Sequence, residues 1–199
     1  QMRSRIESLL KVPVQHLWIG TFHGLAHRML RRHWREAKLP QNFQIIDSDD
    51  QLRLIKRLFK SLEIDDSRFA PKEVQWFING QKDEGLRPQH IDDEGDADRR
   101  QLVSLYQSYE DVCQRGGLVD FAELLLRAHE LLRDNAELLQ HYRRRFQHLL
   151  VDEFQDTNAI QYAWLRLLAG DKGVPFAVGD DDQSIYSWRG AEIKNFLEF

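Results

Sequence analysis

The chain is poor in cysteine and proline and has no long hydrophobic run. Its 199 residues include one cysteine and five prolines. No segment approaches the roughly 18–20 consecutive apolar residues that a membrane-spanning helix needs, which argues against an integral membrane protein. Because Cys113 has no second cysteine with which to pair, no internal disulfide can form, and we expect a reducing, cytoplasmic compartment and a buried or half-buried thiol.

Charge of neither sign dominates the composition. The 28 basic and 32 acidic residues give a net charge of −4, which argues against a small basic protein that coats DNA but leaves room for a local basic groove. The hydrophobic fraction of 42% and the charged fraction of 30% are typical of a globular chain, not a disordered one. The length fits one large domain or two small ones.

Three short apolar runs, at 17–20, 148–152 and 175–180, are rich in β-branched and aromatic residues. Their apolar residues are continuous and do not alternate with polar ones, which predicts strands that are buried on both faces, as in a parallel sheet covered by helices. Two of the runs end in carboxylates. In open α/β sheets ligands bind at the carboxyl ends of the strands, so these acids are functional candidates.

The segment from 40 to 147 is predicted to be helical throughout. Capping boxes at 48–51 and 120–123 open two helices, Pro71 suits the first turn of another, and Gly116–Gly117 ends a fourth. A last helix is expected from about Ala136, and 92–98 reads as a solvated acidic loop. The fold class predicted is α/β: a partial parallel sheet with a large all-helical insertion between its first and second strands.

Two adjacent carboxylates, Asp152 and Glu153, follow the second predicted strand, and Thr157 or Asn158 caps the next helix. At a strand end, one acid of such a pair can hold a hydrated Mg²⁺ while the other orients and deprotonates a water that attacks a phosphate. The alternative is a solvated loop with an acidic helix start, which the helix dipole favours on its own.

A second group of polar and aromatic residues follows the third predicted strand. It contains the acids at 180–182, then Gln183, Tyr186, Trp188 and Arg189. The two aromatic side chains are either core residues or a platform on which unpaired bases stack, with Arg189 near a phosphate or an acidic partner.

These segments resemble the motifs of superfamily 1A DNA helicases, in the UvrD/PcrA/Rep group. Residues 151–158 look like motif II, the Walker B box, and residues 179–191 look like motif III. Residues 21–24 resemble the TFH-type motif Ib, and 117–124 resemble a further signature of the family. The motifs occur in the family's order and spacing, and the resemblance covers essentially the whole chain.

The resemblance implies a role for each matching residue. Asp152 would help to hold Mg²⁺ and Glu153 would be the general base for the hydrolytic water. Gln183 would contact the γ-phosphate of ATP and report nucleotide state to the DNA groove, and Arg189 would link motif III to a phosphate or a neighbouring acid.

The resemblance also implies a DNA-binding surface. Tyr186 and Trp188 would stack on single-stranded bases, Phe22 and His23 would touch the same strand, and Arg189 would lie beside it.

The family resemblance further implies a P-loop NTPase fold of the RecA-like type. Residues 1–39 and 148–199 would belong to RecA-like domain 1A, and 40–147 to the helical insertion domain 1B. The complete protein would be an ATP-dependent 3′→5′ helicase that acts on single-stranded DNA and single-strand/duplex junctions in repair or replication. It would work in the bacterial cytoplasm near the nucleoid, with DNA-repair proteins as further partners.

One departure from the family pattern concerns ATP binding. The family cradles the phosphates with a Gly-rich loop that ends in Gly-Lys-Thr or Gly-Lys-Ser, and this chain contains no Gly-Lys dipeptide. The second RecA-like domain is also absent. The sequence therefore predicts a fragment that needs the remainder of the helicase and is inactive alone.

Other interpretations stay open. His23 and His27 have the i, i+4 spacing of a zinc helix, but Gly24 stands where a metalloprotease needs its Glu. A two-metal nuclease could use the acids at 152–153 and 180–182, with 192–194 as an E-x-K site. A DNA- or protein-binding module without catalysis is a third hypothesis.

Two groups of basic residues are also ambiguous. One falls along a predicted helix at Arg28, Arg31, Arg32, Arg35 and Lys38, and the other is the run 143–145. Such runs are typical of solvated faces, although they can attract a DNA backbone.

Overall fold

The computed structural model describes residues 2–11, 13–65 and 68–179, and helices predominate in this part of the chain. The helices are α1 (Met2–Leu10), α2 (Phe22–Arg32), α3 (Ser48–Ser61), α4 (Pro71–Asp83), α5 (Ala97–Gly116), α6 (Phe121–Arg133), α7 (Ala136–Arg145) and α8 (Ala159–Ala169). The short elements are the strands β1 (Gln44–Ile45), β2 (Leu118–Val119), β3 (His148–Val151) and β4 (Val174–Ala177), and the 3₁₀ turns η1 (Pro88–His90) and η2 (Phe154–Asp156). Every helix in these ranges is too short or too polar to cross a membrane.

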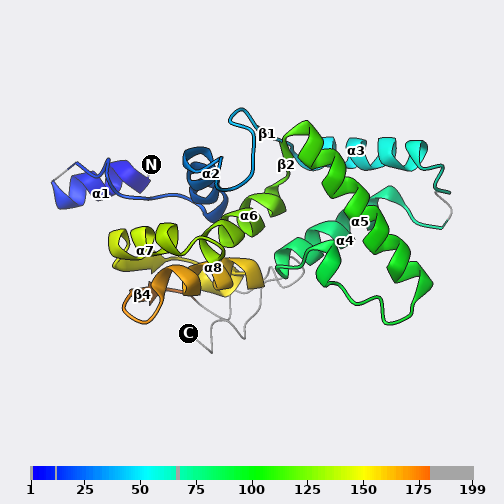
Figure 1. Ribbon diagram of the computed structural model, residues 1–199. Coiled ribbons are helices and arrows are strands. Elements are labelled where there is room, and N and C mark those ends of the chain that lie inside the picture. Colours follow the sequence, from blue (N-terminus) through cyan, green and yellow to red (C-terminus); the bar gives the residue numbers. More distant parts are fainter. Residues whose placement is uncertain (1, 12, 66–67, 180–199) are drawn as a thin grey trace.

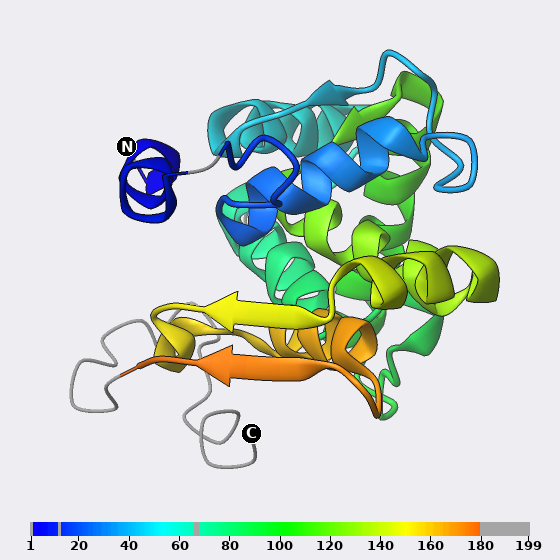
Figure 2. The ribbon, with the colours of Figure 1, turned by 90° about the vertical axis from the view of Figure 1, so that its left-hand side faces the viewer.

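Strands β3 and β4 pair in parallel and α8 connects them, so this unit is a small β-α-β crossover (Figure 2). The register runs from His148 opposite Val174 to Val151 opposite Ala177. The sequence predicted strands at both places, and both form. The mixture of helices and small parallel sheets is compatible with part of an α/β helicase domain.

The prediction that these strands are buried on both faces is wrong. Val151 is buried on the side of α8, but Leu150 is 78% exposed and Phe176 is 62% exposed. Successive side chains of a strand point to opposite faces, and in the described part of the chain helix α8 covers one face only. The apolar residues of the other face therefore lie at the surface.

The first predicted strand, at 17–20, does not form. These residues make a turn and an irregular segment, in which Leu17 N donates to Val14 O at 3.0 Å. A strand needs a neighbour with which to exchange backbone hydrogen bonds, and no described segment offers one here. Instead, Trp18 packs edge-on against Tyr142 and Phe146 of the α7 region, with ring centroids 5.5 and 5.2 Å apart.

The segment 40–147 is not helical throughout, because β1 and β2 pair in parallel within it. Gln44 N donates to Gly117 O at 2.8 Å, and Ile46 N donates to Val119 O at 3.0 Å. Gly117 ends α5 with a φ of 60°, the left-handed conformation that glycine adopts without strain. This turn brings the end of α5 back beside the segment that leads into α3.

Most helix starts agree with the sequence signals. Asp120 caps α6 and accepts from Glu123 N, Pro71 is the first residue of α4, and Asn158 caps α8. At α3 the cap lies one residue before the predicted position: Asp47, not Ser48, accepts from Asp50 N at 2.8 Å. Both residue types are good caps, and Asp47 has the extended backbone that a cap requires.

A minor hydrophobic cluster holds Val151, Phe154 and Leu165. The helices that build the two main clusters lie at opposite ends of the ribbon in Figure 1. The smaller is built by α3, α4 and α5, around residues such as Ile55, Ile78 and Tyr106. The larger joins α2, α6, α7 and α8, around residues such as Met29, Leu125 and Trp164. Cys113 is buried in the smaller cluster, and its burial raises the pKa of the thiol to about 12.

Candidate functional site

The carboxylates of Asp152 and Glu153 lie exposed at the carboxyl end of β3. Asp152 Oδ1 accepts a hydrogen bond from Glu153 N at 3.1 Å, and Glu153 Oε2 accepts one from Gln155 Nε2 at 2.7 Å. Within the described part of the chain, neither carboxylate forms an ion pair with Lys or Arg. Both therefore keep lone pairs directed to solvent.

The backbone around Glu153 is held in an uncommon conformation. Its φ of 53° is in the left-handed region, where a non-glycine residue costs about 1–2 kcal/mol. Two hydrogen bonds hold the turn: Val178 N donates to Val151 O at 2.8 Å, and Phe154 N donates to Val178 O at 3.0 Å. The chain that continues from β4 thus fixes the direction in which Glu153 leaves β3.

The residues after Glu153 fasten this turn to α8. Gln155 is almost fully buried, and Asn158 caps the helix by accepting from Gln161 N at 3.0 Å. Gly179 lies so close that a Cβ there would collide with the amide of Gln155. The segment that follows β4 is therefore in contact with the segment that follows β3, and a side chain at Gly179 would force the amide of Gln155 to move.

The donor set at the end of β3 fits Mg²⁺ held jointly with a substrate. Mg²⁺ prefers carboxylate oxygens and is usually bound by one or two of them, with waters and substrate phosphates completing its shell. Asp152 and Glu153 offer this kind of set. Among the described residues no group of three or more His, Cys, Asp or Glu side chains could hold a metal ion. His27 of the possible zinc pair accepts from Arg31 Nε at 2.9 Å.

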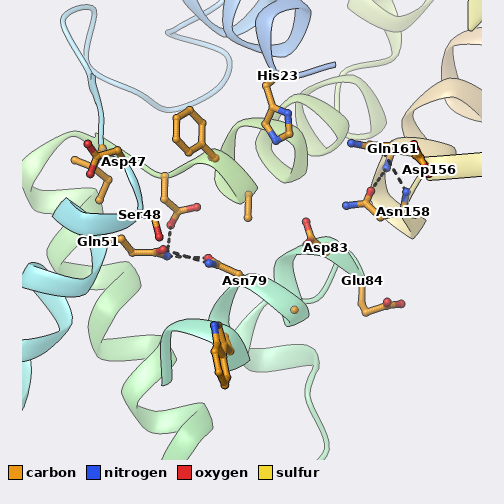
Figure 3. Close-up of a pocket in the computed structure, with 16 residues that line it drawn as sticks. His23, Asp47, Ser48, Gln51, Asn79, Asp83, Glu84, Asp156, Asn158 and Gln161 are labelled. Carbon is orange, nitrogen blue, oxygen red and sulfur yellow. Dashed lines mark hydrogen bonds between the residues drawn. The ribbon is translucent and has the colours of Figure 1, made fainter. Parts of the chain in front are cut away.

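A groove of about 1080 Å³ lies between the two ends of the molecule (Figure 3). It is bounded by the start of α2, α3, α6 and α8 and by the second half of α4. Its lining residues are His23, Ile46, Asp47, Ser48, Gln51, Trp76, Asn79, Gly80, Asp83, Glu84, Asp120, Phe121, Ala122, Asp156, Asn158 and Gln161. The groove therefore reaches the motif II segment at Asp156 and Asn158.

Two exposed aromatic side chains and one histidine line this groove. Trp76 is 64% exposed and Phe121 is 49% exposed. His23 meets Phe121 edge-on, with ring centroids 6.1 Å apart. Phe22, the neighbour of His23, is half-buried against Trp164 at 6.3 Å. Of the two predicted motif Ib contacts, His23 is thus in the groove, whereas Phe22 packs towards the core.

The groove carries acids and amides but few cations. Burial lowers the pKa of His23, so its imidazole is neutral at pH 7. Burial, together with Glu84 and Asp120, raises the pKa of Asp83 to about 7. Asp156 also has a raised pKa, from burial and from Glu153. This lining suits the flat, largely uncharged faces of bases better than it suits phosphates.

A buried ion cluster lies beneath the groove, and sequence reasoning missed it. Lys82 Nζ lies 2.8 Å from Glu110 Oε1, 2.8 Å from Asp120 Oδ2 and 2.9 Å from Glu123 Oε2. Burial alone would lower the pKa of Lys82, but these three carboxylates raise it well above its ordinary value. Tyr109 also donates to Asp120 Oδ2 at 2.7 Å.

Arg87 extends the cluster. Its guanidinium forms a two-bonded pair with Glu123 at 2.8 Å, a pair with Glu130 at 2.6 Å, and a short contact with Glu110. Glu123 also pairs with Arg127 at 2.7 Å. Lys82 and Arg87 come from the α4 end of the molecule, and Glu123 comes from α6. The cluster therefore joins the two main hydrophobic clusters, and the signature at 117–124 supplies two of its four acids, Asp120 and Glu123.

Phe121 is the other residue that sequence reasoning missed. It stands directly after the cap residue Asp120, so it was absorbed into the capping box. The spacing gives no signal of its exposure: Leu124, Leu125 and Ala128 follow Phe121 by three, four and seven residues, which places it on the buried face of α6, yet at the first turn its side chain is 49% exposed. An aromatic residue placed there is available to a ligand.

Several predicted site residues lie outside the described residues. They are Gln183, Tyr186, Trp188 and Arg189, together with the acids at 180–182 and the E-x-K segment of the nuclease hypothesis. Their roles remain predictions.

Comparisons with known proteins agree with one another. The profile of the UvrD/REP helicase N-terminal domain matches residues 1–199. The chain is 58% identical over 199 residues to DNA helicase II of Escherichia coli and 56% identical over 203 residues to DNA helicase II of Haemophilus influenzae. It is 38% identical over 200 residues to the ATP-dependent DNA helicase PcrA of Staphylococcus epidermidis. Each match covers the whole chain but only 27–28% of the relative's length.

Proposed function

Because the chain belongs to the UvrD/REP helicase N-terminal domain family, we propose that it is the part of an ATP-dependent DNA helicase that activates the hydrolytic water and forms one DNA-contacting groove. The observation that carries this proposal is the exposed carboxylate pair at the end of β3. Glu153 is held by its backbone and by Gln155, and it has no cation partner among the described residues.

In this proposal the two acids divide the work of ATP hydrolysis. Asp152 would help to hold the Mg²⁺ that accompanies ATP, and the chemistry that this ion would supply is neutralisation of charge on the phosphates. Glu153 accepts the proton of the attacking water, since a carboxylate that points to solvent can reach a water beside a bound phosphate. Gln183 contacts the γ-phosphate, and Arg189 links motif III to a phosphate or an acid.

The chain alone does not turn over ATP in this account. Its 199 residues contain no Gly-Lys dipeptide with which a loop could cradle the phosphates, and they span only 27–28% of the length of the relatives it matches. Steady, DNA-stimulated ATP hydrolysis by the purified 199-residue chain would contradict this part of the proposal.

The groove contacts single-stranded DNA through its bases. His23 and Phe121 form one aromatic wall, and Trp76 adds a second exposed ring. Tyr186 and Trp188 stack on further bases, and Phe22, next to His23 in sequence, packs against Trp164. In the complete protein this contact serves 3′→5′ translocation and unwinding at single-strand/duplex junctions during repair or replication.

The domain assignment belongs to the same proposal. Residues 1–39 and 148–199 form part of RecA-like domain 1A, and the helices within 40–147 form insertion domain 1B. The proposed partners are the remainder of the helicase and DNA-repair proteins. The proposed location is the cytoplasm near the nucleoid.

Substitution of Glu153 tests the hydrolytic role. In the complete helicase, Glu153→Gln should lower kcat by about 10²- to 10⁴-fold, because the general base is lost while the side chain keeps its size. ATP binding and single-strand binding should stay unchanged. Glu137→Gln, an exposed change on α7, is the matched control. Retained turnover in Glu153→Gln would place the base elsewhere.

Substitution of Phe121 tests the groove. Phe121→Ala should weaken oligo-dT binding by about 1–3 kcal/mol and leave its salt dependence unchanged, because base stacking neutralises no phosphate. Leu62→Ala, which also removes an exposed apolar side chain, is the control. Equal affinities for the two variants would refute the groove as a base-binding site.

A further inference from the structure

The arginines of this chain fall into two groups. Those of the first group, Arg53, Arg68, Arg87, Arg100, Arg127 and Arg133, each form an ion pair with a carboxylate. Those of the second group form no ion pair within the described part of the chain, and Arg28, Arg32 and Arg145 are three of its members. We call these three residues the arginine patch.

The three guanidiniums converge from two helices onto one ring. Arg28 and Arg32 belong to the second half of α2, and Arg145 is the last residue of α7. The ring of Trp18, which Arg28 covers at 4.5 Å, lies 5.5 Å from the ring of Tyr142. The charges of Arg32, Arg145 and Arg28 all oppose the rise that burial causes in the pKa of Tyr142, which agrees with this arrangement. Positive charge therefore concentrates at one place on a chain whose net charge is −4.

Uncharged groups, not carboxylates, hold these guanidiniums in position. Arg28 lies over the ring of Trp18, 4.5 Å from its centroid. Arg32 lies near the hydroxyl of Tyr142, which hydrogen-bonds with His33 Nε2 at 2.8 Å. Arg145 Nη2 donates to His16 O at 3.4 Å. Arg28 and Arg145 are thus positioned without being neutralised, and an anion that binds the patch meets full positive charge.

Other basic residues nearby are engaged differently. Arg143, the first of the run at 143–145, turns inward and donates to Leu167 O at 2.9 Å. Lys38 lies beyond the end of α2, which stops at Arg32, so the long basic helix that the sequence suggested is shorter than expected. Glu36 follows Arg32 by four residues, but its Oε1 lies 3.9 Å from His33 Nδ1 and forms no ion pair with Arg32.

We propose that the arginine patch binds the phosphate backbone of duplex DNA, at a surface separate from the base-binding groove. A guanidinium presents a planar fork of N–H groups that matches a phosphate. Arg28 and Arg32 are one helical turn apart, about 6 Å, and a duplex strand carries a phosphate every 3.4 Å or so of its axis.

The patch offers nothing on which a base could stack. Arg28 lies over the ring of Trp18, whose edges meet Tyr142 and Phe146, and Tyr142 is buried. A surface of this kind contacts backbone and not bases, which favours a duplex over a single strand. The groove has the opposite character, with exposed rings and few cations.

Helix α2 connects the two surfaces. His23 lies in the groove near its start, and Arg32, nine residues on, lies in the patch, about 14 Å along the axis. If the groove holds a single strand, which rests on the proposed function, α2 contacts the single strand at one end and the duplex at the other. The contact between the patch and the duplex backbone does not require a single strand in the groove.

Salt-dependent DNA binding by the 199-residue chain tests the proposal. The triple variant R28Q/R32Q/R145Q should lower the slope of log Kd against log salt for a short blunt duplex by about 2–3, since each phosphate contact contributes about 0.9. The control R53Q/R68Q/R133Q removes the same charge from ion-paired arginines and should change the slope by less than about 1. Equal slopes in the two triples would overturn the proposal.

Two further arms separate this surface from the groove and from misfolding. The affinity for oligo-dT of the same length should fall in Phe121→Ala and change little in R28Q/R32Q/R145Q. If R28Q/R32Q/R145Q lost affinity for oligo-dT and not for the duplex, the patch would bind the single strand and the proposal would be overturned. R28K/R32K/R145K should restore the slope. Arg145→Gln alone, at an exposed position, should lower the slope by about 0.9 even where the triple unfolds. If poly-glutamate bound the arginine patch more tightly than the duplex does, the patch would be assigned to an acidic protein partner and the proposal would be overturned.

Discussion

The acids around Lys82 and the acids after β3 are the same residue types in opposite settings. Glu110, Asp120 and Glu123 surround a buried lysine, and their oxygens are occupied by cations and donors. Asp152 and Glu153 stand in solvent with one hydrogen bond each to their own chain. The carboxylates around Lys82 hold helices together, whereas those after β3 remain available to a substrate.

The two regions also differ in packing. The α3–α5 end has a core of its own, with Ile55, Ile78 and Tyr106 fully buried. The β3–β4 pair has Leu150 and Phe176 at its surface. The exposed face of the sheet therefore contributes little to stability, whereas the helical end has a packed core.

The largest expected effect comes from breaking the ion cluster. Lys82→Met leaves three carboxylates close together in a buried site, and loss of one partner of a buried ion group costs about 3–5 kcal/mol. Urea unfolding of the chain measures this loss. Lys56→Met, an exposed change on α3, should shift the free energy of unfolding by less than about 0.5 kcal/mol. Comparable losses for both variants would mean that the cluster does not hold the helices together.

Hydrogen exchange compares the regions directly. Amides of α3 and α5 should exchange more slowly than those of β3, because their opening exposes a packed core while β3 has one covered face. The comparison of residues 52–62 and 102–112 with 148–152 gives the measurement. Faster exchange in α3 and α5 than in β3 would contradict the conclusion that the helical end is the more stable region.

The third comparison concerns pH and a single carboxyl group of the groove. The folded state holds the proton of Asp83 up to about pH 7, whereas the unfolded chain releases it near 3.8. Its contribution to stability therefore falls as pH rises between these values and is constant above them. Asp83→Asn should remove this fall, so the variant gains on the parent as pH increases. Denaturant unfolding at acidic, neutral and mildly alkaline pH would detect it, and a gain largest in acid would contradict the assignment.

The sequence predicted local structure better than tertiary surroundings. Helix starts such as Asp120 and Pro71 depend on a few neighbouring residues, and they form where expected or, at Asp47, one residue away. The strand at 17–20 failed because pairing depends on a partner that no local pattern specifies. The exposure of Leu150 was missed for the same reason, since burial depends on what lies across the sheet.

The candidate site was predictable only in part. Asp152 and Glu153 stand at the end of an apolar run, which a sequence reveals. The cluster of Lys82 with Glu110 and Glu123 joins residues far apart in the chain, and each acid alone looks like a solvated surface residue. Phe121 was hidden because its neighbours form a capping box.

One matched pair of variants tests the central comparison most directly. Glu123→Gln and Glu153→Gln make the same change of one atom in the two regions. We predict that Glu123→Gln lowers the free energy of unfolding by about 3–5 kcal/mol, because Lys82 and Arg87 lose a buried counter-charge. Glu153→Gln should change it by less than about 0.5 kcal/mol. Equal losses, or a larger loss for Glu153→Gln, would contradict the division between structural and available carboxylates.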